Sequence, residues 1–182
     1  VDLEVRRGEV VTLLGRNGVG KTTTSLNLAA ALARGGLDPL AIDLDPQAHL
    51  TIIGDVPVAS GADSVFGFYA QARPLSDLVR KFPPGGNIIP SHMELSKVDA
   101  LHGKGLKSVM RLKSAIQEEM LEQEEAPIVI DCCPMLNVLS LNAIFASGKV
   151  LVPISADFLS VKGALQLEST LKALEHVVKK RI

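Results

Sequence analysis

The chain has 182 residues, of which 47% are hydrophobic, and this length and composition fit one domain with a substantial core. Only 3% of the residues are aromatic, so the core must be aliphatic, as in parallel sheets that are covered by helices. With a formal net charge of −1, the chain as a whole does not attract polyanions. Any contact with nucleic acid would therefore need a local basic patch. The sequence has no apolar run of the ~20 residues that a membrane span needs and no signal peptide, so we expect a cytoplasmic protein without a membrane anchor.

Short apolar runs alternate with helical patterns along the first half of the chain. Residues 10–14 and 40–44 are strand candidates, and the helical pattern between them begins near Lys21 and stops at a Gly-Gly pair. A helix is expected over residues 74–82, with proline near its start and Pro-Pro-Gly-Gly after its end, and a short strand at 87–89.

The second half of the chain continues this alternation. Strands are predicted at 127–131 and 150–154, and helices at 106–120, 140–147 and 160–178. Strands that alternate with helices indicate an α/β fold of three layers, in which helices flank a mostly parallel sheet. We expect this fold to form a single nucleotide-binding domain over the whole chain.

A phosphate-binding pattern lies between the first strand and the first helix. Residues 15–22 read GRNGVGKT and match G-x-x-x-x-G-K-[ST] in full. In such loops the glycines let backbone N–H groups point at phosphate oxygens, the lysine reaches the β- and γ-phosphates, and the Ser/Thr hydroxyl coordinates Mg²⁺. A glycine-rich turn with an accidental lysine is the alternative, which the full motif in its proper context disfavours. The residues predicted to bind ATP and Mg²⁺ are Gly15, Arg16, Asn17, Gly18, Val19, Gly20, Lys21, Thr22 and Thr23.

Three aspartates at strand ends complete the predicted site. Asp131 closes an apolar strand, which is the Walker B arrangement of a carboxylate that serves the magnesium shell. Asp43 and Asp45 lie at the end of another strand, and ligands of open α/β sheets bind outside the carboxyl ends of the strands. All three are therefore expected on the nucleotide side. A solvated turn opened by Asp-Pro is the alternative for Asp43 and Asp45.

Four stretches of the chain carry a family resemblance, and they read GVGKTTTSLNLAAALARGG, AIDLDPQAHLT, IVIDCCPML and NAIFASGKVLVPISADFLSVKGALQL. From about Gly18 onward the chain resembles the ParA/MinD family of deviant Walker ATPases. The resemblance implies a switch that forms a homodimer with ATP and Mg²⁺, binds DNA nonspecifically or an activating partner protein, and is reset to ADP by slow hydrolysis. It also implies that Asp45 positions the attacking water, that Asp43 supports the magnesium shell and that Asp131 holds magnesium through water. Residues 132–138 would then form a switch segment that senses the γ-phosphate.

Two positions of the phosphate loop differ from the family signature K-G-G-x-G-K-[ST], because Arg16 and Asn17 stand in its first two places. The signature lysine reaches across an ATP-sandwiched dimer to the partner's phosphates, so the resemblance implies a catalytic role for Arg16 beside Lys21 and Asp45. A guanidinium fork is not interchangeable with an ammonium group, and Asn17 adds a side chain where glycine allows close backbone approach. A nucleotide-binding module with impaired hydrolysis is therefore the alternative function.

The opening of the chain carries a second resemblance. The sequence VDLEVRRGEVVTLLGRNGVGKTTT is similar to the start of ABC-transporter ATPases, and this similarity stops at about residue 24, which leaves a natural or engineered chimera as one interpretation. An ABC-type ATPase subunit is a further alternative, but the chain has no LSGGQ-like signature, and Cys132 rather than glutamate follows Asp131. The C-terminal strand and loop with which the family contacts the base are expected after residue 182.

Three smaller signals remain open or unremarkable. The region 102–113 has basic and no acidic residues, which fits either a solvated helix or a docking surface for a partner. The KKR at 179–181 is a possible DNA contact, although three charges at a chain end are more often only solvated. Cys132 and Cys133 are expected to be small buried hydrophobic residues of a reducing compartment, since adjacent thiols rarely form a disulfide and cannot supply the geometry of an iron–sulfur cluster.

Overall fold

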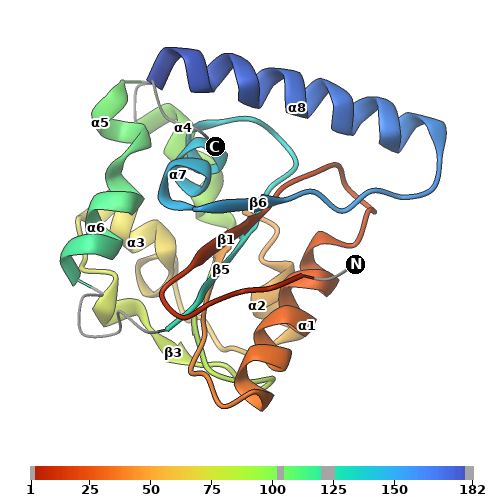
Figure 1. Cartoon of the computed structure of the whole chain (residues 1–182). Coiled ribbons are helices and arrows are strands. Elements are labelled where there is room, and N and C mark those ends of the chain that lie inside the picture. The colour runs from red at the N-terminus through yellow and green to blue at the C-terminus, as the bar shows by residue number, and fades with distance from the viewer. Residues whose placement is uncertain (1–2, 102–104, 120–125, 179–182) are drawn as a thin grey trace.

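The computed structural model describes residues 3–101, 105–119 and 126–178. Its strands form one sheet in the order β3-β4-β2-β5-β1-β6 (Figure 1). Every neighbouring pair is parallel except β3 and β4, which are antiparallel. The strands are β1 Val10–Leu13, β2 Leu40–Leu44, β3 Arg80–Lys81, β4 Asn87–Ile89, β5 Ile128–Cys132 and β6 Lys149–Leu151. The strands expected at 40–44 and 87–89 are confirmed with the same bounds, and those expected at 10–14, 127–131 and 150–154 are confirmed with shifted ends.

Helices cover both faces of this sheet. They are α1 Lys21–Arg34, α2 His49–Ile53, α3 Val65–Gln71, α4 Val98–Leu101, α5 Leu106–Val109, α6 Arg111–Glu119, α7 Val138–Ala146 and α8 Phe158–Val178. Short 3₁₀ turns lie at Gly61–Asp63, Ser76–Leu78 and Met93–Lys97. None of the helices in the described part of the chain is long and apolar enough to cross a membrane.

Two hydrophobic clusters, one on each face, hold the layers together; they are mostly aliphatic, with aromatic side chains from α3 in the larger and Phe82 in the smaller. Alternate residues of β2 divide between them, because side chains along a strand point to opposite faces. Leu40 and Ile42 join the larger cluster with α3, α6 and α7, whereas Ala41 joins the smaller one with Ala29 of α1 and Leu50 of α2. The three-layer α/β architecture predicted from the sequence is therefore confirmed, with α8 lying outside β6 and α7 (Figure 1).

The helix expected over residues 74–82 is wrong. That segment forms a single 3₁₀ turn and then β3, which pairs with β4. The N–H of Phe82 donates to the carbonyl of Gly86 at 3.1 Å, and Gly85 and Gly86 have φ angles of 145° and 82°. The Pro-Pro-Gly-Gly sequence that was interpreted as a helix stop is thus the turn of a hairpin.

The helix expected over residues 106–120 is interrupted. It consists of α5 and α6, with Met110 between them, and residue 120 lies outside the described residues. The stretch 54–73, which has no clear sequence pattern, contains α3. The Ser64 hydroxyl caps α3 by accepting the N–H of Phe66 at 3.2 Å.

Candidate functional site

The loop between β1 and α1 has the backbone that its glycines predict. Gly18 and Gly20 have φ angles of 82° and 85°, in the left-handed region that favours glycine. Helix α1 begins immediately afterwards at Lys21, with no side-chain cap on its N-terminus and no acidic residue in its first turn. The free N–H groups and the positive end of the helix dipole are therefore available to an anion at this loop.

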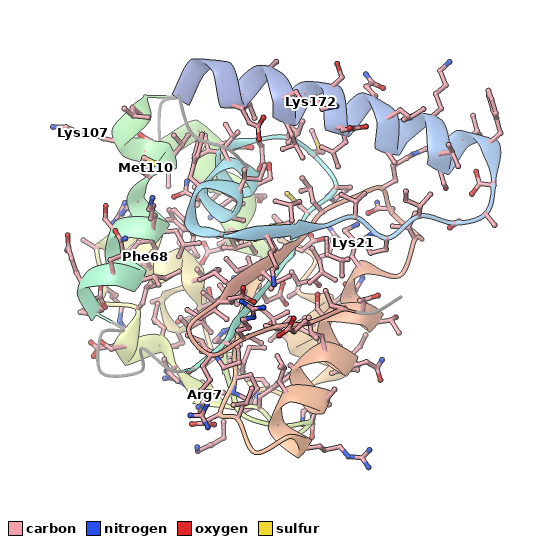
Figure 2. All side chains as sticks on the ribbon, in the orientation of Figure 1. Arg7, Lys21, Phe68, Lys107, Met110 and Lys172 are labelled. Carbon is pink, nitrogen blue, oxygen red and sulfur yellow. The ribbon has the colours of Figure 1, made fainter. Side chains whose placement is uncertain are left out.

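Lys21 lies on the inner side of the loop. Its side chain is only 6% exposed, and its ammonium group donates to the backbone carbonyl of Arg16 at 2.9 Å. Figure 2 shows Lys21 among the side chains of the interior, whereas Lys107 points away from the molecule. A buried ammonium group beside free backbone N–H groups is suited to phosphate oxygens, which form charge-assisted hydrogen bonds with both.

Asp131 is a buried carboxylate that contacts the first turns of α1, directly after this loop. It is 1% exposed, and its Oδ1 accepts the Ser25 hydroxyl of α1 at 3.1 Å. Its Oδ2 accepts no hydrogen bond from the described residues. Burial raises the pKa of Asp131, and the hydroxyls of Thr22 and Ser25 oppose this rise. A buried carboxylate oxygen without a partner, close to the Thr22 hydroxyl, fits the oxygen ligands that Mg²⁺ prefers.

Asp43 lies directly beside Asp131 in the pairing of β2 with β5. It is fully buried, and its two oxygens accept the N–H of Asp45 at 3.1 Å and the N–H and hydroxyl of Thr51 at 2.9 and 2.7 Å. Burial, and then the charge of Asp131, raises the pKa of Asp43 to about 7. Since these contacts engage both oxygens with the protein's own groups, Asp43 orders the loop after β2. Its support of a magnesium shell stays a prediction.

Asp45 follows β2 by one residue and is held by its surroundings. Its Oδ1 accepts the N–H of Gln47 at 2.9 Å, and its backbone carbonyl accepts the Ser91 hydroxyl at 2.7 Å. The Ser91 N–H in turn donates to the Thr51 hydroxyl at 2.9 Å. Sequence reasoning missed the roles of Thr51 and Ser91. Thr51 ends the stretch AIDLDPQAHLT, but nothing in the sequence assigns its hydroxyl to Asp43, and Ser91 comes from a separate segment that carries no motif.

The structure brings Lys21, Thr22 and the three aspartates together at the carboxyl ends of the inner strands β1, β2 and β5. It places other predicted site residues elsewhere. The guanidinium of Arg16 donates to the backbone carbonyl of Leu159 in α8 at 3.2 Å. The side chains of Asn17 and Thr23 are exposed. The predicted contacts of these three side chains with nucleotide stay predictions.

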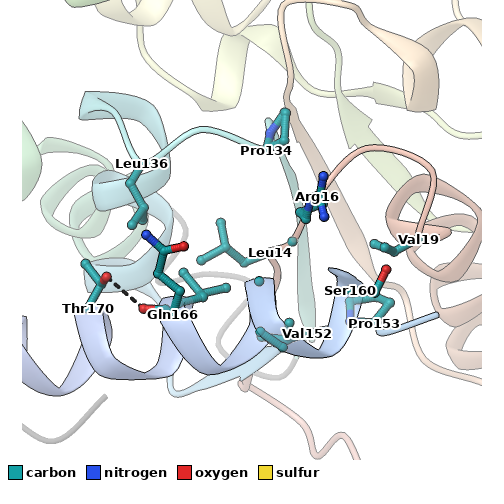
Figure 3. A pocket seen from close by; sticks show the side chains of 14 residues that line it. Leu14, Arg16, Val19, Pro134, Leu136, Val152, Pro153, Ser160, Gln166 and Thr170 are labelled. Atoms are coloured by element: carbon teal, nitrogen blue, oxygen red, sulfur yellow. Dashed lines mark hydrogen bonds between the residues drawn. The ribbon is translucent and has the colours of Figure 1, made fainter. Parts of the chain in front are cut away.

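A cavity of about 200 Å³ lies beside the phosphate loop (Figure 3). Its walls come from the loop, the segment after β5, the end of β6 and α8, and they include Arg16, Val19, Pro134, Val152 and Gly163. The predicted switch segment therefore borders both the loop and α8.

The cysteines of the predicted switch segment are free and buried, as expected. Cys133 faces Asn137, whose side chain caps α7 in a capping box with Ser140. Met135 in the same segment is 69% exposed. Among the described residues, no group of three or more His, Cys, Asp and Glu side chains is arranged as a metal site. A magnesium site here would depend on Thr22, Asp131 and the phosphates of a nucleotide, as is usual for Mg²⁺.

A parallel sheet, a glycine-rich loop that leads into a helix, and buried carboxylates at adjacent strand ends define a P-loop nucleotide-binding fold. The family model described as AAA domain matches residues 10–182, and the chain belongs to that family. The match includes residues 10–24 of the segment that resembles ABC-transporter ATPases.

Curated relatives narrow this assignment to the ParA/MinD group. The chain is 32% identical over 168 residues to the chromosome partitioning protein ParA of Caulobacter vibrioides, a match that covers 92% of this chain and 63% of the relative. It is 29% identical to the sporulation initiation inhibitor protein Soj of Bacillus subtilis, over 92% of this chain and 66% of Soj. The chain thus spans somewhat less than two thirds of these relatives, and the resemblance to the ParA/MinD family is confirmed.

Solved structures agree with the fold. Cobyrinic acid a,c-diamide synthase from Mycobacterium smegmatis, with bound ADP and magnesium, has a TM-score of 0.84 and 28% identity over 93% of this chain and 69% of that one. The McdA–ATP complex of Cyanothece has a TM-score of 0.82 over 94% of this chain and 66% of that one, and its identity of 22% supports the fold alone.

Proposed function

We propose that the chain is the nucleotide-binding domain of an ATP-dependent switch of the ParA type, which binds ATP with Mg²⁺ and hydrolyses it slowly. The observation that carries this proposal is Asp131, a buried carboxylate with an unpartnered oxygen beside Thr22 and the phosphate loop. The magnesium-bound nucleotides in structures of similar fold support it.

Each residue of the site has a distinct task in this proposal. The loop N–H groups and Lys21 hold the phosphates, and Thr22 and Asp131 hold Mg²⁺, with Asp131 acting through water. Bound Mg²⁺ would neutralise the charge that develops on the phosphates. Asp45 positions the attacking water, and Asp43 fixes Asp45 by accepting its backbone N–H at 3.1 Å.

We propose further that ATP and Mg²⁺ close a homodimer that positions DNA or a cellular cargo with the help of an activating partner. Relatives that are named chromosome partitioning and cell division proteins support this role. The exposed Met135 and Leu136 in the segment after β5 would give such a partner an apolar contact next to the site.

The alternative function is a nucleotide-binding module with impaired hydrolysis. The contact of Arg16 with Leu159 of its own α8 favours it, because a guanidinium held there cannot reach a partner's phosphates. The exposed Asn17 side chain, in the place where the signature has glycine, supports the same alternative. A separate origin of segment 1–24, which its resemblance to ABC-transporter ATPases favours, belongs to the same alternative, although the family match already begins at residue 10.

The substitution Asp131→Asn tests the proposed site. It keeps the size of the side chain and can keep the bond to Ser25, but it removes the charge that serves Mg²⁺. We expect the Mg²⁺-dependent gain in ATP affinity to fall by roughly 10- to 100-fold, the usual cost of losing an outer partner of a bound metal. The exposed Asp77→Asn is the matched control and should bind as the unchanged protein does. An Asp131→Asn protein with full magnesium dependence, measured by titration calorimetry, would contradict the proposal.

A further inference from the structure

Arg16 belongs to the phosphate loop, yet its side chain leaves the loop and lies on α8. The guanidinium Nη1 donates to the backbone carbonyl of Leu159, in the first turn of this helix, at 3.2 Å. The backbone carbonyl of the same arginine accepts the ammonium group of Lys21 at 2.9 Å. One residue therefore connects the lysine that is expected to hold phosphates with the start of α8.

Gly163 provides the space that this arrangement needs. A Cβ atom at position 163 would lie 2.9 Å from Cδ and 3.6 Å from Cγ of Arg16. Glycine weakens a helix relative to alanine, so its presence within the 21-residue α8 is unfavourable unless packing requires it. The close passage of the Arg16 side chain is such a requirement.

A negative charge near Arg16 also favours its position on α8. Asp157 precedes α8 and accepts the N–H and the hydroxyl of Ser160 at 2.9 and 2.6 Å. These hydrogen bonds hold the pKa of Asp157 below its usual value, and the positive charge of Arg16 adds to the effect. The carboxylate thus stays charged and attracts the guanidinium to this end of the helix.

We propose that the Leu159 carbonyl, Gly163 and Asp157 form a seat in cis for Arg16, and that Arg16 must leave it before two copies of the chain associate with ATP. The inference rests on the proposed function, because the association that it regulates is the proposed homodimer. While it is hydrogen-bonded to Leu159 of α8, the guanidinium stays within its own subunit. Once released, it can reach the phosphates of a second copy, and α8 is no longer tied to the loop.

A double-mutant cycle tests the seat without any nucleotide. Gly163→Ala should raise the thermal midpoint through its higher helix propensity, but the added methyl group collides with Arg16. In an Arg16→Ala background the collision is gone, so the same substitution should raise the midpoint by about 2–4 °C more than it does in the unchanged protein.

Gly148→Ala is the matched control, because a Cβ atom there would meet nothing within 4 Å. Its effect should be the same with and without Arg16. Equal effects of Gly163→Ala in the two backgrounds would overturn the seat, whether or not the protein binds ATP.

Sedimentation with a non-hydrolysable ATP analogue and Mg²⁺ tests the regulatory part. Gly163→Ala displaces Arg16 from Leu159, so it should lower the dissociation constant of the dimer by roughly three- to tenfold relative to Gly148→Ala, the size of one charge-assisted hydrogen bond near the surface. An unchanged or weaker dimer would overturn this part. If the unchanged protein binds the analogue but neither it nor any variant forms a dimer, both the proposed homodimer and its regulation by Arg16 are contradicted. The double-mutant cycle of thermal midpoints still tests whether the seat exists.

Discussion

The centre of the sheet and its β6 edge differ in how firmly they are held. All five residues of β2 and all five of β5 are buried, and each of these strands has hydrogen-bonded neighbours on both sides. The three residues of β6 are half-buried, and β6 is one of the two edge strands of the described sheet. The neighbouring α8 exposes large apolar side chains, with Phe158 at 79% and Leu165 at 61%.

This difference separates two tasks within one site. Asp43 and Asp131 come from the buried centre, where dense packing on both faces fixes their positions. Arg16 is attached to α8 at the edge, where fewer buried contacts make displacement less costly. The centre is therefore suited to holding phosphates and Mg²⁺, and the edge is suited to changing with the state of the nucleotide.

The largest effect is expected at the centre, from Asp45→Ala. The variant should still bind ATP, because the phosphates are held by the loop and Lys21, but its hydrolysis should fall on the order of 100-fold when the group that positions the water is lost. Steady-state phosphate release and ATP titration measure the two quantities, with the exposed Asp77→Ala as control. Unchanged turnover would remove Asp45 from its role.

Thr51→Val should destabilise the fold by about 1–3 kcal/mol, because the Thr51 hydroxyl both donates to Asp43 at 2.7 Å and accepts the Ser91 N–H at 2.9 Å in a buried place. The same change at the half-buried Thr170 of α8, whose hydroxyl donates to the Gln166 carbonyl in an exposed hydrogen bond, should cost much less. Urea unfolding compares the two. Equal costs would show that the brace around the aspartates contributes nothing particular.

A dependence of stability on pH should come from the same pair of strands. The pKa of Asp43 rises from 3.8 to about 7 in the folded protein, so the folded state binds more protons than the unfolded state between these values. This contribution is therefore full below about pH 4 and is lost as the pH rises toward 7, by at most about 1.4 kcal/mol per pH unit. Asp43→Asn should remove this component of the slope, and Asp77→Asn should keep it. An identical slope in all three proteins would contradict the assignment.

At the edge, the double substitution Arg16→Lys with Asn17→Gly restores the signature of the partition family. If the present pair impairs hydrolysis, turnover should rise by about three- to tenfold, the scale of one charge-assisted contact. Nucleotide affinity should hardly change, because the loop N–H groups and Lys21 are retained. An unchanged turnover would indicate that Arg16 and Asn17 do not impair hydrolysis. It would therefore weaken the alternative of a nucleotide-binding module with impaired hydrolysis.

The sequence predicted what depends on local patterns. The phosphate loop was predicted because its glycines, lysine and threonine are contiguous, and Asp131 because an acidic residue ends an apolar strand. The helix over 74–82 was wrong because prolines and glycines mark a helix stop and a hairpin turn alike, and pairing with β4 decides between them.

Contacts between segments that are distant in the chain could not be predicted from the sequence. Ser91 reaches Thr51 across 40 positions, and Arg16 reaches Leu159 across 143. Contacts between residues so far apart in the sequence produce no periodic pattern from which they could be predicted. The sequence gives no reason for a glycine at position 163 within a helical pattern. The structure supplies the reason, because the Arg16 side chain passes close to this position.

The molar mass of the protein in solution tests the central claim most directly. Light scattering would compare the protein in ADP with Mg²⁺ and in a non-hydrolysable ATP analogue with Mg²⁺. An ATP-dependent switch predicts a mass that doubles only with the triphosphate analogue. A protein that binds the analogue and yet keeps the mass of one chain would contradict the switch and leave a nucleotide-binding module whose Arg16 stays on α8.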